Sequence, residues 1–204
     1  MLDLPTHAST PRERRHAETA AEILAAAWDL ARRDGLAGIS LRELARRVGL
    51  RAPSLYTYFD SKAALYDAMF RQGHEELAGM VAGWPELAEE TSDVRAAVER
   101  RSAEFAAWCA AEPARYQLLF QRTVPDFEPS PGSYALAVRL LEHLERDLAA
   151  LGITDRDAVD LWTALISGLV SQQVANDPGG DRWLRLVGTA VDMFLDHYTR
   201  EDPA

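Results

Sequence analysis

Apolar residues recur at helical spacing in several long stretches of this chain. Between about residues 18 and 34 they fall three or four positions apart, at Ala20, Ile23, Leu24, Ala27, Leu30 and Ala31, so they share one face of a helix. Similar spacing or helix-start chemistry predicts helices over about 41–48, 53–58, 62–83, 93–111, 113–120, 134–151, 156–175 and 182–198. No stretch shows the strict alternation of a half-buried strand. The pattern therefore predicts an all-α fold of about nine helices.

Two short helices are predicted between residues 40 and 60, with a tight turn between them. Ser40 and Glu43 have the spacing of a capping box, which would start the first helix at Leu41. Gly49 would end that helix, because glycine adopts the left-handed conformation at little cost. Pro53 lies where the first turn of the next helix would tolerate a residue without an N–H. This arrangement is typical of a helix-turn-helix.

The spacing alone does not separate a DNA-binding helix-turn-helix from a plain helical hairpin, which also needs a glycine turn. The second helix and its end favour DNA. They carry hydrogen-bonding and aromatic side chains, namely Arg51, Ser54, Tyr56, Thr57 and Tyr58. A helix that enters the major groove needs such donors for base edges and phosphates.

The run from Gly49 to Met69 resembles the end of the DNA-binding domain of the tetracycline-repressor (TetR) family. The matching positions are Gly49, Ser54, Leu55, Tyr56, Tyr58, Phe59, Lys62 and Leu65. The resemblance covers roughly residues 18 to 70, and it departs from many members at Leu41 and Ala52. It implies a three-helix helix-turn-helix domain over residues 18–66 and a helical ligand-binding and dimerisation domain over residues 67–204. It also implies a double-stranded DNA operator and a homodimer as partners.

The expected DNA contacts combine this resemblance with the donors on the surface. They are Arg42, Arg51, Ser54, Tyr56, Thr57, Tyr58 and Lys62. Lys62 is the only lysine in the chain, and it falls in the first turn of a helix, where a cation opposes the helix dipole. This placement indicates a phosphate contact, although a solvated lysine is the simpler alternative.

The charge distribution supports a DNA-binding N-terminal part. The whole chain has a formal net charge of −10, yet residues 1–72 hold 11 Lys+Arg and 9 Asp+Glu, and the remainder holds 11 and 23. The first part is therefore net positive, as phosphate binding requires. Residues 1–17 are expected to be a disordered tail. Its cluster of Arg12, Arg14 and Arg15 could reach DNA, but a solvated tail is the favoured interpretation.

Large side chains gather in the acidic C-terminal part, around a proline-rich loop at 124–132. Such a set can wall a ligand cavity, although aromatic residues at helical spacing are usually core. The expected ligand-binding residues are Phe105, Trp108, Tyr116, Phe120, Trp162 and Ile166, with Gln117, Gln121, Arg122, Gln172 and Gln173 as polar anchors. This set predicts a small apolar ligand.

The last two helices have apolar arcs wider than a single core face needs. Exposed apolar surface would remain in a monomer, so we expect two chains to pair them into a four-helix bundle. The expected interface residues are Leu165, Leu169, Val187, Val191 and Phe194. The alternative is a thick monomeric core that covers both faces.

Catalytic and metal-binding motifs are not found in this sequence. It has no G-x-S-x-G, H-E-x-x-H or P-loop run, and its five histidines are scattered. His74 and His143, each beside glutamates, are expected on solvated helix faces. Cys109 is the only cysteine, so an intrachain disulfide is excluded, and it is expected to be a buried apolar residue.

These observations together predict a DNA-binding transcriptional regulator, not an enzyme, with no cofactor and no metal. No apolar run is long enough to span a bilayer, so a cytoplasmic location is expected. The favoured hypothesis is a repressor that a small hydrophobic ligand releases from a palindromic operator. A ligand-independent architectural DNA-binding protein is the main alternative, and an all-α enzyme with a helical cavity is a weaker one.

Overall fold

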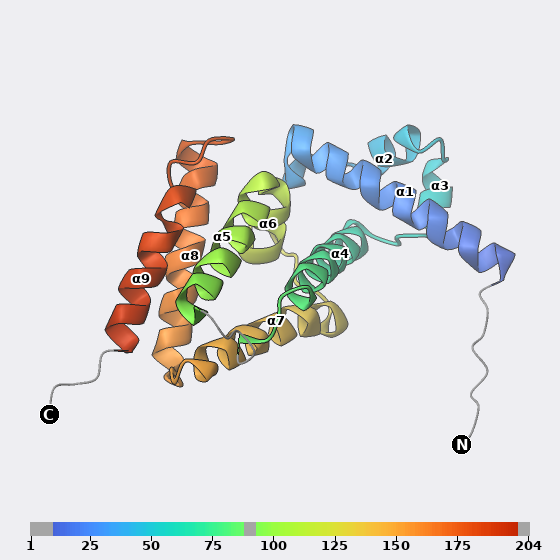
Figure 1. Cartoon of the computed structure of the whole chain (residues 1–204). Helices are drawn as coiled ribbons and strands as arrows, with labels where there is room; N and C mark the ends of the chain where they lie inside the picture. The colour runs from blue at the N-terminus through green and yellow to red at the C-terminus, as the bar shows by residue number, and fades with distance from the viewer. Residues whose placement is uncertain (1–9, 88–92, 200–204) are drawn as a thin grey trace, which may run out of the picture. The chain divides into compact units, whose positions relative to one another are not determined.

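A computed structural model describes residues 10–87 and 93–199, and all regular secondary structure within these ranges is helical. The nine α-helices of these residues, α1 to α9 in Figure 1, confirm the all-α prediction. The chain divides into two compact units. The N-terminal unit extends to Met69 and includes Val124–Glu128, and the C-terminal unit comprises Phe70–Thr123 and the residues from Pro129 onward. The division thus falls after Met69 rather than after Tyr66, and helix α4 contributes residues to both units.

The N-terminal unit is built on one long helix, α1 (Pro11–Asp34). A short 3-10 turn (Leu36–Gly38) leads to α2 (Leu41–Arg47) and α3 (Ala52–Leu55), and the first turns of α4 (Lys62–Ala82) complete the unit. Helix α1 packs against α2, and α2 against α3. The fully buried side chains of this unit include Ile23, Leu30, Leu44, Leu55 and Leu65. These are the apolar positions that the helical spacing predicts.

Helix α1 begins about seven residues earlier than predicted, so residues 11–17 are not a disordered tail. The hydroxyl of Thr10 accepts a hydrogen bond from the backbone N–H of Glu13 (3.2 Å), and the Glu13 carboxylate accepts one from the N–H of Thr10 (2.7 Å). This is a capping box, with Pro11 in the first turn. The sequence Thr-Pro-Arg-Glu contains that signal, but the lack of apolar residues masks it. The rest of the predicted tail, residues 1–9, lies outside the described residues.

The capping box predicted at the start of α2 is wrong, although the helix does begin at Leu41. The Ser40 side chain makes no cap hydrogen bond. The Glu43 carboxylate instead accepts hydrogen bonds from Arg46 (2.9 and 2.7 Å) and Arg47 (3.3 Å), one turn further along. These charge-assisted bonds occupy the carboxylate, and the bond to Arg46 is the main reason why the pKa of Glu43 is lowered.

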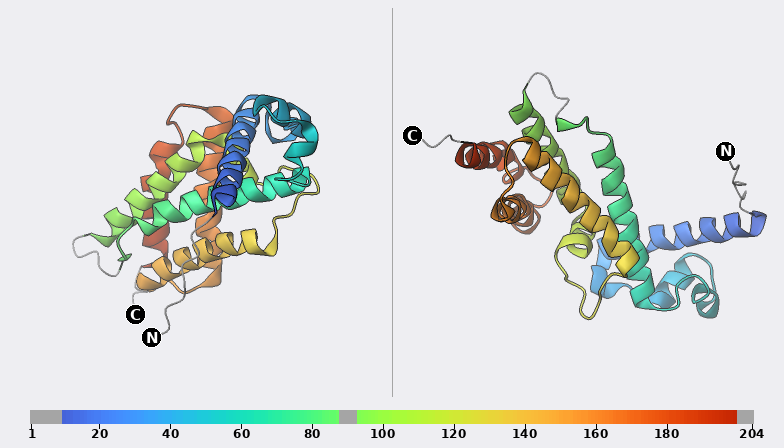
Figure 2. Two further views of the ribbon diagram at one scale, coloured as in Figure 1. Left: turned by 90° about the vertical axis from the view of Figure 1, so that its right-hand side faces the viewer. Right: turned by 90° about the horizontal axis from the view of Figure 1, so that it is seen from below.

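The C-terminal unit contains the second part of α4 and five further helices. These are α5 (Val94–Ala111), α6 (Pro113–Phe120), α7 (Pro131–Ala150), α8 (Arg156–Asn176) and α9 (Val187–Tyr198). Helix α5 packs against both α8 and α9, which run side by side in Figures 1 and 2. Their core includes Cys109, Leu148, Ile166, Val170 and Val191. The buried cysteine agrees with its predicted role as a small apolar residue.

The last α-helix starts later than its apolar pattern predicts, at Val187 rather than near Arg182. A 3-10 turn (Leu184–Leu186) precedes it. The buried amide of Gln173 on α8 fixes this segment, because its oxygen accepts hydrogen bonds from the N–H groups of Trp183 (2.8 Å) and Leu184 (3.4 Å). Gln173 therefore caps the α8–α9 connection and is not the ligand anchor that the sequence predicted.

Candidate functional site

The helix-turn-helix of the N-terminal unit is built around the turn at Gly49. This glycine has φ of +70°, a left-handed conformation that side chains disfavour, and the N–H of Leu50 donates to the carbonyl of Ala45 (2.8 Å). Ala45 on α2 and Leu55 on α3 are buried, at 1% and 0% exposure. The small side chain lets the helices approach, and the leucine fixes α3 in place.

Most of the predicted DNA contacts lie on the exposed side of this motif. Arg42, Arg51, Ser54, Tyr56 and Thr57 are all exposed, and Tyr56 keeps half of its surface accessible. The Thr57 hydroxyl donates to the Ser54 carbonyl (2.7 Å), so its oxygen is left to accept hydrogen bonds. This surface can therefore present guanidinium, hydroxyl and phenol groups to a duplex.

Lys62 makes a structural contact that sequence reasoning missed. Its Nζ atom donates to the backbone carbonyl of Ala37 (3.0 Å) and lies 5.5 Å from the ring centroid of Tyr66. The Tyr66 hydroxyl donates in turn to the carbonyl of Leu36 (2.6 Å). Two side chains at the start of α4 thus bind the 3-10 turn that follows α1. The contact with the Ala37 carbonyl accounts for a lysine at a helix start even when no phosphate is bound. The ammonium group has three N–H donors, so two remain for other acceptors.

The extended start of α1 lies against the same motif. The ring of His16 stacks on that of Tyr58, with centroids 4.5 Å apart and the planes 25° from parallel. Arg12 lies one helical turn before His16, and Arg12, Arg14, Arg15 and His16 are all exposed. Helical spacing therefore places Arg12 and His16 on one face. The stack brings a basic helix end next to a predicted DNA contact.

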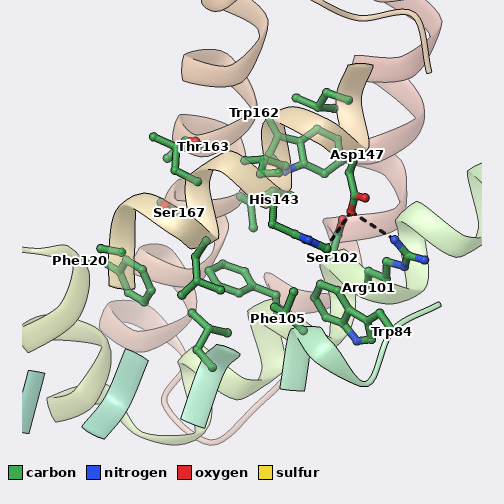
Figure 3. Close-up of a pocket in the computed structure, with 18 of the residues that line it drawn as sticks. Trp84, Arg101, Ser102, Phe105, Phe120, His143, Asp147, Trp162, Thr163 and Ser167 are labelled. Carbon is green, nitrogen blue, oxygen red and sulfur yellow. Dashed lines mark hydrogen bonds and ion pairs between the residues drawn. The ribbon is translucent and has the colours of Figure 1, made fainter. Parts of the chain in front are cut away.

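A cavity of about 340 Å³ lies within the C-terminal unit. Residues from α4, α5, α6, α7 and α8 line it, and most of them are apolar. Of the predicted ligand-binding residues, Phe105, Phe120, Trp162 and Ile166 contribute to the lining. Figure 3 shows three of them around the cavity, with Phe120 on the opposite side from Arg101.

Two predicted ligand contacts do not line this cavity. The guanidinium carbon of Arg115 lies over the ring of Trp108, 3.7 Å from the ring centroid. Tyr116 is buried, and its hydroxyl donates to the carbonyl of Ser167 (3.0 Å). The predicted polar anchors, Gln117, Gln121, Arg122, Gln172 and Gln173, are also not among the lining residues. Periodicity indicated that these side chains share a helical region, but not which of them face the cavity.

The polar side of the cavity consists of residues that sequence analysis assigned to the surface or overlooked. Arg101 on α5 donates from Nη1 to Oδ2 of Asp147 on α7 (3.2 Å), and the two side chains are only 5% and 15% exposed. Nε2 of His143 lies 3.7 Å from the same Oδ2. Figure 3 shows these groups converging with Ser102. His143 and Asp147 alternate with leucines on the buried face of α7. This spacing is the sequence signal that could have placed both side chains inside the unit and not on its surface.

His74 also lines the cavity and is 1% exposed, so its predicted place on a solvated face is wrong. Its Nδ1 atom lies 3.0 Å from the carbonyl of Phe70. Burial lowers the pKa of this imidazole, and the backbone bond only partly opposes that effect. His74 is therefore neutral near pH 7 and adds no charge to the cavity.

Three of the predicted dimer contacts are internal. Val187, Val191 and Phe194 are 1%, 0% and 3% exposed and belong to the core formed with α5 and α8. Their side chains therefore cannot form an interface without unpacking the unit. Leu165 and Leu169 are half-buried against the same core. The large apolar side chains left exposed on α8 and α9 are Leu161 (49%) and Met193 (68%).

The described residues offer little support for other kinds of site. Across 10–87 and 93–199 no group of three or more His, Cys, Asp or Glu side chains is placed to hold a metal ion. Within the same ranges, no helix combines the length and apolar character needed to cross a membrane.

Comparisons identify relatives of both parts of the chain. The family model for bacterial regulatory proteins of the tetR family matches residues 23–69. A curated HTH-type transcriptional regulator of Mycobacterium tuberculosis is 29% identical over 181 residues, which cover 78% of this chain and 74% of the regulator. A regulator of Mycobacterium bovis matches equally well.

Solved structures share the fold over nearly the whole chain. NalD, the secondary repressor of the MexAB-OprM multidrug efflux pump in Pseudomonas aeruginosa, has a TM-score of 0.66 and 22% identity, covering 92% of this chain and 100% of its own. The multidrug binding protein EbrR, complexed with imidazole, has a TM-score of 0.62 and 22% identity over 91% and 96%. FadR from Bacillus subtilis, in complex with stearoyl-CoA, has a TM-score of 0.62 and 15% identity over 86% and 97%.

Proposed function

We propose that this chain is a repressor of the tetR family, whose family model matches residues 23–69, and that it leaves its DNA operator when a small apolar ligand enters the cavity. The observation that carries this proposal is the pairing of two features in one chain. One is a helix-turn-helix with exposed donors, and the other is an apolar cavity in a separate unit. NalD is a repressor and EbrR a multidrug binding protein, which supports the proposal by analogy.

On the DNA side, Arg42, Arg51, Ser54 and Thr57 would contact base edges or phosphates, and Tyr56, Tyr58 and Lys62 would contact phosphates. The exposure of Arg42, Arg51, Ser54, Thr57 and Tyr56 supports these contacts. The stack of His16 on Tyr58 supports an added contact from the start of α1, where Arg12 would meet a flanking phosphate.

The regulator would act as a homodimer, as the resemblance implies. Leu161 on α8 and Met193 on α9 are the exposed apolar side chains that support pairing of these helices. Two helix-turn-helix motifs related by a twofold axis would bind half-sites about 34–36 Å apart or at a multiple of that repeat. The operator would then be a near-palindrome.

Two parts of the chain would transmit ligand binding. Helix α4 contributes residues to both units. The segment Val124–Glu128 follows the α6 helix that carries Phe120, yet it belongs to the N-terminal unit, where the ring of Phe127 packs 5.6 Å from that of Tyr66. A ligand that binds the DNA-free arrangement a hundredfold better would shift the equilibrium by about 2.7 kcal/mol.

The test is a selection of genomic fragments with the purified chain, followed by titration of the enriched site. We expect a near-palindromic motif whose affinity falls steeply with salt. Arg51→Ala should relax specificity, while Arg156→Ala, an exposed arginine of the C-terminal unit, serves as the matched control. Enrichment of no motif would refute the proposal. A motif whose binding responds to no apolar compound would favour the ligand-independent architectural protein.

A further inference from the structure

The chemistry of the cavity's polar side restricts the ligand that it can hold. Five ionisable side chains line the cavity: His74, Arg101, Tyr134, His143 and Asp147. Arg101 and Asp147 are bonded to each other at 3.2 Å, so their charges compensate locally. Neither sign of charge is left in excess for a ligand to neutralise. A carboxylate or an ammonium group would lose its hydration there without gaining a free counter-ion.

The imidazole of His143 has one nitrogen without a hydrogen-bond partner. Nε2 of His143 is buried and has no hydrogen-bond partner, because Asp147 lies beyond hydrogen-bond distance at 3.7 Å. The other ring nitrogen, Nδ1, lies 3.3 Å from Nη2 of Arg146. A guanidinium only donates, so Nδ1 must accept. In the neutral imidazole the proton then resides on Nε2, which makes this atom a donor without an acceptor.

The lining also carries the hydroxyl groups of Ser102, Tyr134, Thr163 and Ser167. The hydroxyl of Ser102 already donates to the carbonyl of Val98 (2.7 Å). His74 lies on α4, where its ring packs against that of Phe70 and lies 5.9 Å from that of Phe120. No contact joins it to Asp147 among the described side chains. The rest of the lining is largely aliphatic and aromatic. The cavity therefore presents the Nε2–H of His143 as a donor in a largely apolar, charge-compensated enclosure.

We propose that the cavity takes an uncharged apolar molecule whose hydrogen-bond acceptor, such as a ketone, ester or amide carbonyl, binds the Nε2–H of His143. This deepens the proposed function by naming the class of ligand, and it rests on the cavity being the ligand site. The volume of about 340 Å³ is near the lower end of the range for small-molecule pockets, so the molecule is small. Fatty acids and cationic drugs are excluded as preferred ligands.

The test uses three probes with the same chain length and different head groups, namely decan-2-one, decanoate and decylammonium. Each is titrated into the full chain by calorimetry, below its aggregation concentration. We expect the ketone to bind at least about tenfold more tightly than either ion, since one satisfied buried donor corresponds to a change of this size. Equal or tighter binding of an ion, or no binding of any probe, would overturn the proposal.

Variants of His143 test the assigned contact. His143→Phe should weaken ketone binding about tenfold, whereas His143→Gln, which keeps an N–H donor, should retain most of it. His197→Phe is the matched control, because His197 is exposed on α9 and does not line the cavity. If the phenylalanine variant melts early, the glutamine variant and the control still decide the contact. Ketone affinity unchanged in the folded phenylalanine variant would refute it.

The outcomes separate this inference from the regulatory proposal. Calorimetry needs no DNA, so failure of all probes would leave operator binding untouched. Conversely, a chain that binds decan-2-one through His143 but stays on its operator would contradict ligand-driven release and leave the ligand class established.

Discussion

Loss of one partner of the Arg101–Asp147 pair should destabilise the C-terminal unit strongly. The side chains are 5% and 15% exposed and 3.2 Å apart, so the pair is buried rather than solvent-screened. Asp147→Leu would leave the guanidinium buried beside an apolar group. Removal of one member of a buried pair typically costs about 3–5 kcal/mol, whereas an exposed pair contributes about 0–1 kcal/mol. We therefore expect a loss of about 3 kcal/mol or more.

The double replacement Arg101→Met with Asp147→Leu should recover most of that loss. Both charges are then absent, and two apolar side chains of similar size fill the space. The carbonyl of Pro85, which accepts a hydrogen bond from Arg101, loses that donor in the double variant, so the recovery should fall short of complete. Compensation would show that the single variants suffer from an unpaired charge and not from lost volume.

Urea denaturation followed by tryptophan fluorescence measures these differences. Trp28 is the only tryptophan of the N-terminal unit, and the other four lie in the C-terminal unit. In a Trp28→Phe background the signal therefore reports the C-terminal unit, and the protein concentration is held fixed because dimerisation would shift the apparent stability. Asp160→Leu is the control, since its contact with Arg156 at 3.9 Å is over 70% exposed on both sides. If Asp147→Leu changes stability no more than Asp160→Leu does, the buried-pair reasoning is wrong.

Three further predictions concern single side chains. Lys62→Ala should weaken operator binding for all sequences and reduce the salt slope by about one, and fluorescence anisotropy at several salt concentrations that shows an unchanged slope would contradict a phosphate contact. Tyr66→Phe should lower the stability of the N-terminal unit by about 0.5–1.5 kcal/mol in thermal or urea unfolding, because the Leu36 carbonyl keeps the N–H of Ile39 and loses only the Tyr66 hydroxyl, and unchanged stability would count against the Tyr66 bond. Burial raises the pKa of the Cys109 thiol to about 12 from 9.0. Between these pH values the thiol of the unfolded chain ionises and that of the folded chain does not, so the thiol makes stability fall as pH rises. Burial also raises the pKa of Tyr66, so Cys109→Ala should reduce this fall in urea unfolding but not remove it.

Local chemistry in the sequence was enough for the existence of the helices and for the helix-turn-helix, but not for every helix boundary, since Gln173 on α8 delays the start of α9. Apolar spacing, the left-handed turn at Gly49 and the position of Pro53 depend on residues a few positions apart, and each appears in the structure as predicted. The start of α1 was not predicted, although Thr10 and Glu13 form a capping box there. The turn that follows has no apolar residue, so periodicity gave no sign of a helix.

The sites depended on contacts between distant segments, which one sequence does not specify. Lys62 meets the carbonyl of Ala37, and Arg101 meets Asp147, across 25 and 46 positions. Periodicity places a side chain on a face of its own helix, but only packing decides whether that face meets a core, a cavity or solvent. For this reason His143 lines a cavity instead of a solvated face, and Val191 fills the core instead of a dimer interface.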